Sequence, residues 1–241
     1  MFRKLFENIS PKNFYYFSSK IIPWAFFVSV IFITYGLYLG LFVAPQDYQQ
    51  GDAFRIIYVH VPSAWLSLFA YSAVFFCSII TLIWKIKVFE ILTIASAKNG
   101  ALFTFLALVT GAIWGKPMWG TWWVWDARLT SELILLFIYL SIIFLYHSFD
   151  DYRKGAKAAN ILAIIGFINI PIIHFSVEWW NTLHQGPSVM KFSTPSIASE
   201  MLYPLVYTTI GFTSYLFAAV LSSSRNELME REKSTKWIKS I

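Results

Sequence analysis

Six long apolar runs separated by short polar stretches set the pattern of this chain of 241 residues. The runs lie at about 24–43, 63–84, 91–113, 129–147, 158–175 and 201–222. Each is close to the roughly 20 residues that a helix needs to cross about 30 Å of hydrocarbon. The pattern predicts an all-α membrane protein whose six transmembrane helices form one domain over residues 1–222, followed by a short cytoplasmic tail over residues 223–241.

The composition agrees with this class of protein. Hydrophobic residues make up 57% of the chain and charged residues only 13%, which is far from the balance of a soluble globular domain. Glycines are few, so helices are favoured over the alternating strands of a membrane barrel. The first run is too long for a signal-peptide core and no small-residue cleavage site follows it, so we expect it to remain as a membrane helix.

The basic residues predict the orientation of the helices. Fifteen of the nineteen lie in the two termini and in the loops after the second and fourth runs. Because cytoplasmic loops carry an excess of Lys and Arg, both termini are predicted to be cytoplasmic. The stretches 44–62, 114–128 and 176–200 are then predicted to face outward. Topology therefore explains the net charge of +6 without a nucleic-acid partner.

The stretch from Trp114 to Asp126 holds five tryptophans in thirteen positions. On a helix of about 100° per residue, Trp119, Trp122, Trp123 and Asp126 share one face, and Trp125 borders it. We therefore predict a short amphipathic, tryptophan-rich segment on the outer face. Its surface would be flat, aromatic and almost uncharged, which suits a large planar apolar ligand.

An aromatic belt at the membrane surface is the alternative explanation for these tryptophans. Eight of the eleven tryptophans fall on the predicted outer face, whereas a belt would populate both surfaces. The asymmetry favours a ligand site for the segment from Trp119 to Trp125. For Trp65 and Trp114 both interpretations stay open.

Two histidines flank this segment in predicted outer loops. His60 lies just before Pro62, which is expected to begin the second helix, and His184 lies between the fifth and sixth runs. Two neutral imidazoles from separate loops can take both axial positions of a haem iron while indoles contact the porphyrin. A hydrogen-bonding or interfacial role for each histidine is the alternative.

The other two histidines are weaker candidates. His174, near the outer end of the fifth run, could be a buried hydrogen-bonded group, an occasional ligand or a partner for Glu178. His147 ends the fourth run on the predicted inner side, where capping or snorkelling is expected.

Cations near the rim of such a site would suit the two propionates of haem. Arg128 is the main candidate, although it could equally pair with Asp126 or anchor the fourth helix at the interface. Arg55 is interpreted as a loop charge.

Several functions are disfavoured by what the sequence lacks. Cys77 is the single cysteine, so there is no internal disulfide and no Cys-x-x-Cys-His motif of a c-type cytochrome. No glycine-rich phosphate loop is present, so any ATP-driven step must come from a partner. The apolar runs hold no chain of acids or lysines, which argues against proton-coupled transport.

Several motifs resemble those of the haem exporter protein C family, within the haem-handling membrane proteins that carry a tryptophan-rich motif. The motifs are Trp119-Gly-Thr-Trp122-Trp123-Val-Trp125-Asp126, its flanks Trp114-Gly-Lys-Pro-Met and Ala127-Arg-Leu-Thr-Ser-Glu, Asp47-Tyr-Gln-Gln-Gly, Tyr58-Val-His60-Val-Pro, and Val177-Glu-Trp-Trp-Asn-Thr-Leu-His184-Gln-Gly. The resemblance covers about residues 44–186, and the last run and tail carry no motif of this kind.

The resemblance implies a haem-binding and delivery protein, and not an enzyme, in c-type cytochrome biogenesis at the bacterial inner membrane. It implies that haem b is held non-covalently and transiently, with His60 and His184 as the axial ligands of the iron. The full predicted haem site comprises His60, His184, Trp114, Trp119, Trp122, Trp123, Trp125, Asp126 and Arg128. The implied partners are membrane lipid, a periplasmic haem chaperone, and the ATPase subunit, second membrane subunit and small one-span subunit of an ABC-type complex.

Two other classes of protein remain as alternatives. One is a b-type electron-transfer subunit that keeps its haem, although such proteins usually place their ligand histidines on facing helices and not in loops. The other is a structural partner of a transporter, with the tryptophans as a belt and no haem.

Overall fold

The computed structural model describes residues 10–186, 189 and 196–241. Its main helices are α2 (Pro11–Tyr38), α3 (Ile57–Trp84), α4 (Lys87–Trp119), α5 (Ala127–His147), α6 (Tyr152–Gly166), α7 (Asn169–Trp179) and α8 (Ser199–Glu232). A π-helical turn (Leu39–Val43) extends α2, and 3₁₀ turns lie at Asp52–Ile56, directly before α3, and at Ile238–Ser240. Six segments are long and apolar enough to cross a membrane, with α6 and α7 together forming one of them. The prediction of a six-helix, all-α membrane protein is confirmed.

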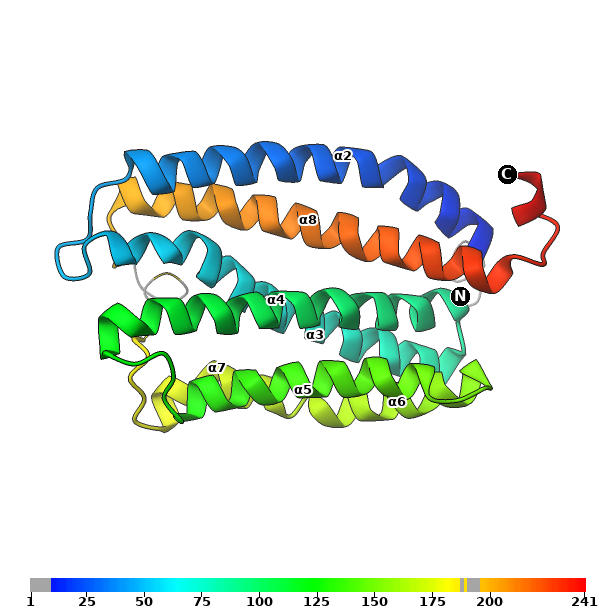
Figure 1. The fold of residues 1–241 in the computed structure, drawn as a ribbon. Coiled ribbons are helices and arrows are strands. Elements are labelled where there is room, and N and C mark those ends of the chain that lie inside the picture. Colours follow the sequence, from blue (N-terminus) through cyan, green and yellow to red (C-terminus); the bar gives the residue numbers. More distant parts are fainter. Residues whose placement is uncertain (1–9, 187–188, 190–195) are drawn as a thin grey trace.

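The helices lie side by side in three layers (Figure 1). Helix α2 pairs with α8, α3 and α4 form the middle layer, and α5 packs with α6 and α7. The connections that follow α2, α4 and α7 all lie at one end of the bundle, which we call the loop end. It is the end that the basic residues predict to face outward.

The tryptophan-rich segment is not the helix that the sequence analysis predicted. Helix α4 continues through Trp114 to Trp119 and ends at Gly120, which adopts a left-handed conformation with φ of 75° and donates its N–H to the Lys116 carbonyl. At the other end, the Asp126 side chain accepts from the backbone N–H of Leu129 at 2.8 Å and begins α5. A glycine that ends one helix and an aspartate that begins the next leave residues 120–126 without helical structure.

The fifth apolar run is broken in its middle. Helix α6 ends at Gly166 and α7 begins at Asn169, so the predicted continuous run over 158–175 contains a turn. Pro171 lies in the first turn of α7, where it has no N–H to donate and its ring would clash with the Phe167 carbonyl of a continuous helix. The Asn169 side chain donates to the Ser131 carbonyl at 2.9 Å, so the break is held against α5.

Helix α8 runs without interruption past residue 222 to Glu232. Near its end, Arg231 forms ion pairs with Glu90 of α4 at 2.6 Å and with Glu227 of α8 at 3.0 Å. The Arg231 side chain is only 10% exposed. These contacts tie α8 to α4 at the end of the bundle opposite the loop end.

Candidate functional site

His60 and His184 lie side by side at the loop end, with ring centroids 6.4 Å apart and ring planes at 38°. His184 lies in the irregular connection after α7, as predicted. The prediction that His60 lies in a loop is wrong, because α3 begins at Ile57 and places His60 in its first turn. Pro62 therefore lies inside the helix and does not begin it. Beside it, Ser63 Oγ donates to the Val59 carbonyl at 2.7 Å.

Both imidazoles use Nδ1 for hydrogen bonds within the protein. His60 Nδ1 is 3.0 Å from Thr110 Oγ1, and because the Thr110 hydroxyl already donates to the Leu106 carbonyl at 2.6 Å, it accepts from His60. His184 Nδ1 is 2.8 Å from the Gln185 carbonyl oxygen, which can only accept. Both rings therefore carry their proton on Nδ1 and keep the Nε2 lone pair for a ligand, which is the form that binds a metal.

The spacing of the two rings suits a metal ion between them. With a metal–nitrogen bond of about 2 Å and a ring centre roughly 1 Å behind Nε2, two axial imidazoles have centres about 6 Å apart. The 6.4 Å observed is close to that value. Among the described residues, no group of three or more His, Cys, Asp or Glu could hold a metal ion. Two imidazoles at this spacing could bind a metal ion whose other ligands belong to the bound molecule, as in a porphyrin.

Residues on one side of α4 contact the His60 ring. Besides Thr110, Trp114 contacts the ring edge to face, with centroids 5.6 Å apart and planes at 82°. A Cβ atom on Gly111 would lie 3.0 Å from His60 Cε1, so glycine leaves the room that the ring needs. Sequence reasoning missed Thr110 and Gly111, since a single threonine and a single glycine in an apolar run carry no signal.

Arg128 and Asp126 do not pair with each other among the described residues. Arg128 Nη1 donates to the Ile173 carbonyl of α7 at 2.6 Å, whereas Asp126 caps α5. Burial, and after it the nearby charge of Arg128, lower the pKa of His184 and favour the neutral imidazole. Among the described residues, the Arg128 side chain therefore bonds to α7 and not to Asp126.

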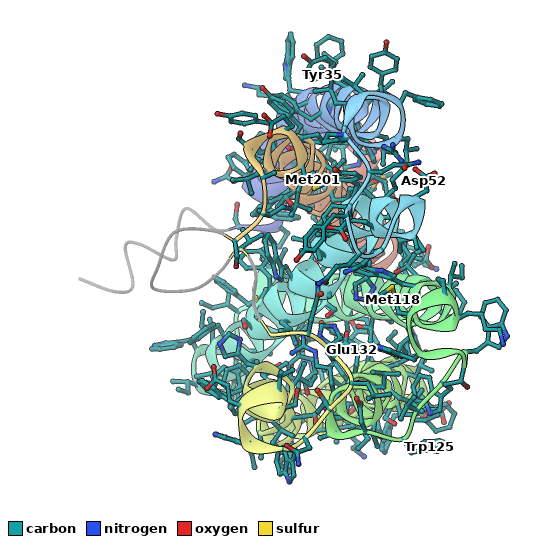
Figure 2. The ribbon with its side chains drawn as sticks, turned by 90° about the vertical axis from the view of Figure 1, so that its left-hand side faces the viewer. Tyr35, Asp52, Met118, Trp125, Glu132 and Met201 are labelled. Atoms are coloured by element: carbon teal, nitrogen blue, oxygen red, sulfur yellow. The ribbon has the colours of Figure 1, made fainter. Side chains whose placement is uncertain are left out.

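The tryptophans of the segment do not form one flat surface. Trp122 is 55% exposed and Trp125 is 76% exposed, and Figure 2 shows Trp125 at the edge of the loop end. Trp123 is half-buried and meets Trp125 edge to face at 5.5 Å. Trp119 is the last residue of α4. The indole in contact with His60 is that of Trp114, for which the sequence left a belt and a site equally open.

Two polar atoms of the segment are enclosed without a hydrogen-bond partner. They are the indole Nε1 of Trp123, a donor, and Oδ2 of Asp126, an acceptor. A buried polar group without a partner is costly, so both atoms are suited to meet a bound ligand or an ordered water.

Glu132 is a buried acid to which the sequence analysis gave no role. It lies on α5 between the helices near the loop end (Figure 2), is 8% exposed, and accepts from Ser67 Oγ of α3 at 2.8 Å. A carboxyl group inside a membrane bundle must be hydrogen-bonded, and Ser67 supplies that bond.

The remaining candidates lie outside the histidine pair. His174 is exposed on α7, so its interpretation as a buried hydrogen-bonded group is wrong, and His147 is exposed at the end of α5. Arg55 is more than a loop charge, because it donates to the Gly40 carbonyl at 2.6 Å and pairs with Asp52 at 2.9 Å.

The chain is similar over its whole length to known proteins. The sequence model of the family described as Heme exporter protein C matches residues 4–239. The chain is 49% identical over 241 residues to Heme exporter protein C of Haemophilus influenzae, with 100% of this chain and 98% of that protein covered. It is 46% identical over 241 residues to Heme exporter protein C of Escherichia coli, with 100% and 97% covered. It is 44% identical over 227 residues to that of Bradyrhizobium diazoefficiens, with 94% and 86% covered. The chain therefore belongs to the Heme exporter protein C family.

Proposed function

We propose that this protein binds haem b non-covalently at the loop end, with His60 and His184 as axial ligands, and delivers it to a periplasmic haem chaperone during c-type cytochrome biogenesis. The observation that carries the proposal is the pair of imidazoles 6.4 Å apart, each with Nδ1 occupied and Nε2 available. The names of the relatives support haem as the cargo.

The residues around the pair fit a porphyrin with two propionates. Arg128 donates one N–H to the Ile173 carbonyl, and its guanidinium group has further N–H donors for a carboxylate. The unpartnered Nε1–H of Trp123 is a second donor, and Trp114 supports the ligand ring of His60. The exposed Trp122 and Trp125 offer an apolar surface at which the haem edge or the chaperone is received.

The protein positions reactants and does not act as an enzyme. Axial ligation holds the iron in place while a histidine of the chaperone reaches a vinyl group at the open haem edge. The work of releasing the loaded chaperone falls to the ATPase subunit of an ABC-type complex that also holds a second membrane subunit and a small one-span subunit. The excess of basic residues at the other end supports an inner-membrane orientation with both termini cytoplasmic.

Absorption spectra of the purified full-length protein test the axial assignment. We expect His60→Ala and His184→Ala each to lose the spectrum of six-coordinate haem and to retain less haem. His174→Ala is the matched control, since His174 is exposed on α7 and, among the ring contacts of the described residues, its partner is Phe175 and neither histidine of the pair. Haem bound with an unchanged spectrum in both site variants would show that the assignment is wrong.

A b-type electron-transfer subunit is the second candidate, and the position of His60 on helix α3 favours it. The two functions differ in the fate of the haem. We expect haem to pass stoichiometrically to an added chaperone, whereas an electron carrier would retain it.

A further inference from the structure

The motif Asp47-Tyr-Gln-Gln-Gly forms a tight turn between α2 and α3. Asp47 Oδ1 accepts the backbone N–H groups of Gln49 at 2.9 Å and of Gln50 at 2.8 Å, and the Gly51 N–H donates to the Asp47 carbonyl at 2.9 Å. Tyr48 and Gln49 are exposed, whereas Gln50 is half-buried. The turn therefore holds one glutamine side chain against the bundle and leaves its neighbours in solvent.

The amide of Gln50 lies between the two histidine-bearing elements. Its Oε1 accepts from Trp114 Nε1 at 2.9 Å, and its Nε2 is 3.4 Å from Oε1 of Gln185. Trp114 contacts the His60 ring. The backbone carbonyl of Gln185 accepts from His184 Nδ1. One side chain thus connects the support of the first imidazole with the support of the second.

The connection that bears His184 makes few hydrogen bonds with other parts of the chain that the structure describes. After α7 ends at Trp179, residues 181–186 have no helix or strand. Among the hydrogen bonds of the described residues, the contact from Gln50 to Gln185 is the one that joins residues 181–186 to another part of the chain. It is long for a hydrogen bond, while the 2.9 Å bond to Trp114 is of ordinary length. Gln50 is therefore held firmly on the His60 side and loosely on the His184 side.

We propose that Gln50 is a positioning residue that sets the separation of the two axial histidines by tethering the His184 connection to Trp114. The proposal rests on the proposed ligation of haem by this pair. Without the tether, the Nε2 atom of His184 would no longer be kept in reach of an iron held by His60. The haem would then change between six-coordinate and five-coordinate forms and would dissociate faster.

The test uses the purified full-length protein loaded with haem. Both measured quantities describe the haem-loaded protein alone, so a smaller amount of folded protein does not change them. Electron paramagnetic resonance and absorption spectra give the share of low-spin, six-coordinate haem, and transfer to excess apomyoglobin gives the dissociation rate. For Gln50→Leu we expect a mixed-spin spectrum and about tenfold faster dissociation or more, since partners of metal ligands typically contribute about 10–100-fold in affinity. Gln50→Glu retains an acceptor for Trp114 and offers a second oxygen to which the Gln185 amide N–H can donate, so both ends of the tether persist and most of the low-spin signal should return.

Two further variants separate the tether from other effects. Gln49→Leu alters the exposed neighbour in the same turn and should match the unaltered protein. Gln185→Leu removes the other end of the tether and should reproduce the effect of Gln50→Leu, so it decides the matter if Gln50→Leu fails to fold. An unchanged spectrum and dissociation rate in Gln50→Leu, or an equal change in Gln49→Leu, would overturn the proposal. Wild-type spectra in His60→Ala and His184→Ala would instead refute the proposed function.

Discussion

Replacing Thr110 by valine tests how the protein prepares His60 for a metal. Valine has nearly the same shape as threonine but cannot accept the Nδ1–H bond that the Thr110 hydroxyl accepts at 3.0 Å. The imidazole then either keeps an Nδ1–H that has lost this acceptor, which costs up to about 1–3 kcal/mol, or moves its proton to Nε2. In the second form the lone pair no longer faces the ligand position. Both outcomes disfavour the state that binds iron.

The magnitude follows from the same bond. A cost of about 1–3 kcal/mol corresponds to roughly 5–150-fold in an equilibrium constant, which agrees with the 10–100-fold typical for partners of metal ligands. We therefore expect Thr110→Val to weaken haem binding by about 10–100-fold. Thr110→Ser keeps the hydroxyl and should remain within about threefold of the unaltered protein.

Haem titration of the purified protein, followed by absorption, measures the effect. Thermal unfolding of the haem-free protein in detergent provides the control, since it reports on the fold and not on the ligand. Equal haem affinity in the valine and serine variants, with both proteins folded, would refute the claim that Thr110 prepares His60.

Two further changes probe the close packing at the site and the opposite end of the bundle. Gly111→Ala places a Cβ 3.0 Å from His60 Cε1 and should displace the ring. We therefore expect a lower share of six-coordinate haem in the absorption spectrum. The same share as in the unaltered protein would contradict this packing argument. Arg231→Ala breaks the ion pair with Glu90 and should lower the free energy of unfolding by about 1–3 kcal/mol, measured by thermal unfolding. The haem spectrum should stay unchanged. An altered spectrum would show that this end of the bundle affects the site.

The number and class of the helices could be predicted because the thickness of the hydrocarbon layer fixes the length of a membrane-spanning apolar run. A run of about 20 apolar residues has few other uses, so the six apolar runs indicated six membrane-spanning segments. Helix boundaries near the loop end were harder to predict. Pro62 was interpreted as the beginning of a helix, but a single turn before a proline is compatible with a helix that starts earlier.

The periodicity of tryptophans was misleading for a different reason. The spacing of Trp119, Trp122, Trp123 and Asp126 matches one helical face, yet the glycine at position 120 ends α4 and the aspartate begins α5. Local backbone preferences at these two residues prevailed over side-chain periodicity. The packing of Thr110 and Gly111 against His60 depends on how α3 and α4 face each other, which a single sequence does not contain.

The structure gives the two histidines unequal support, and this inequality bears on the choice between delivery and electron transfer. His60 is fixed by helix α3, by the Thr110 hydroxyl and by the Trp114 ring. His184 lies on an irregular connection, and its ring bonds to the carbonyl of its own neighbour, Gln185. A protein that keeps its haem gains from two rigid ligands, because fixed ligands slow dissociation. A protein that hands its haem on needs one ligand that holds the iron and a second that can withdraw. The rigid position of His60 on α3 and the looser position of His184 after α7 fit the second requirement.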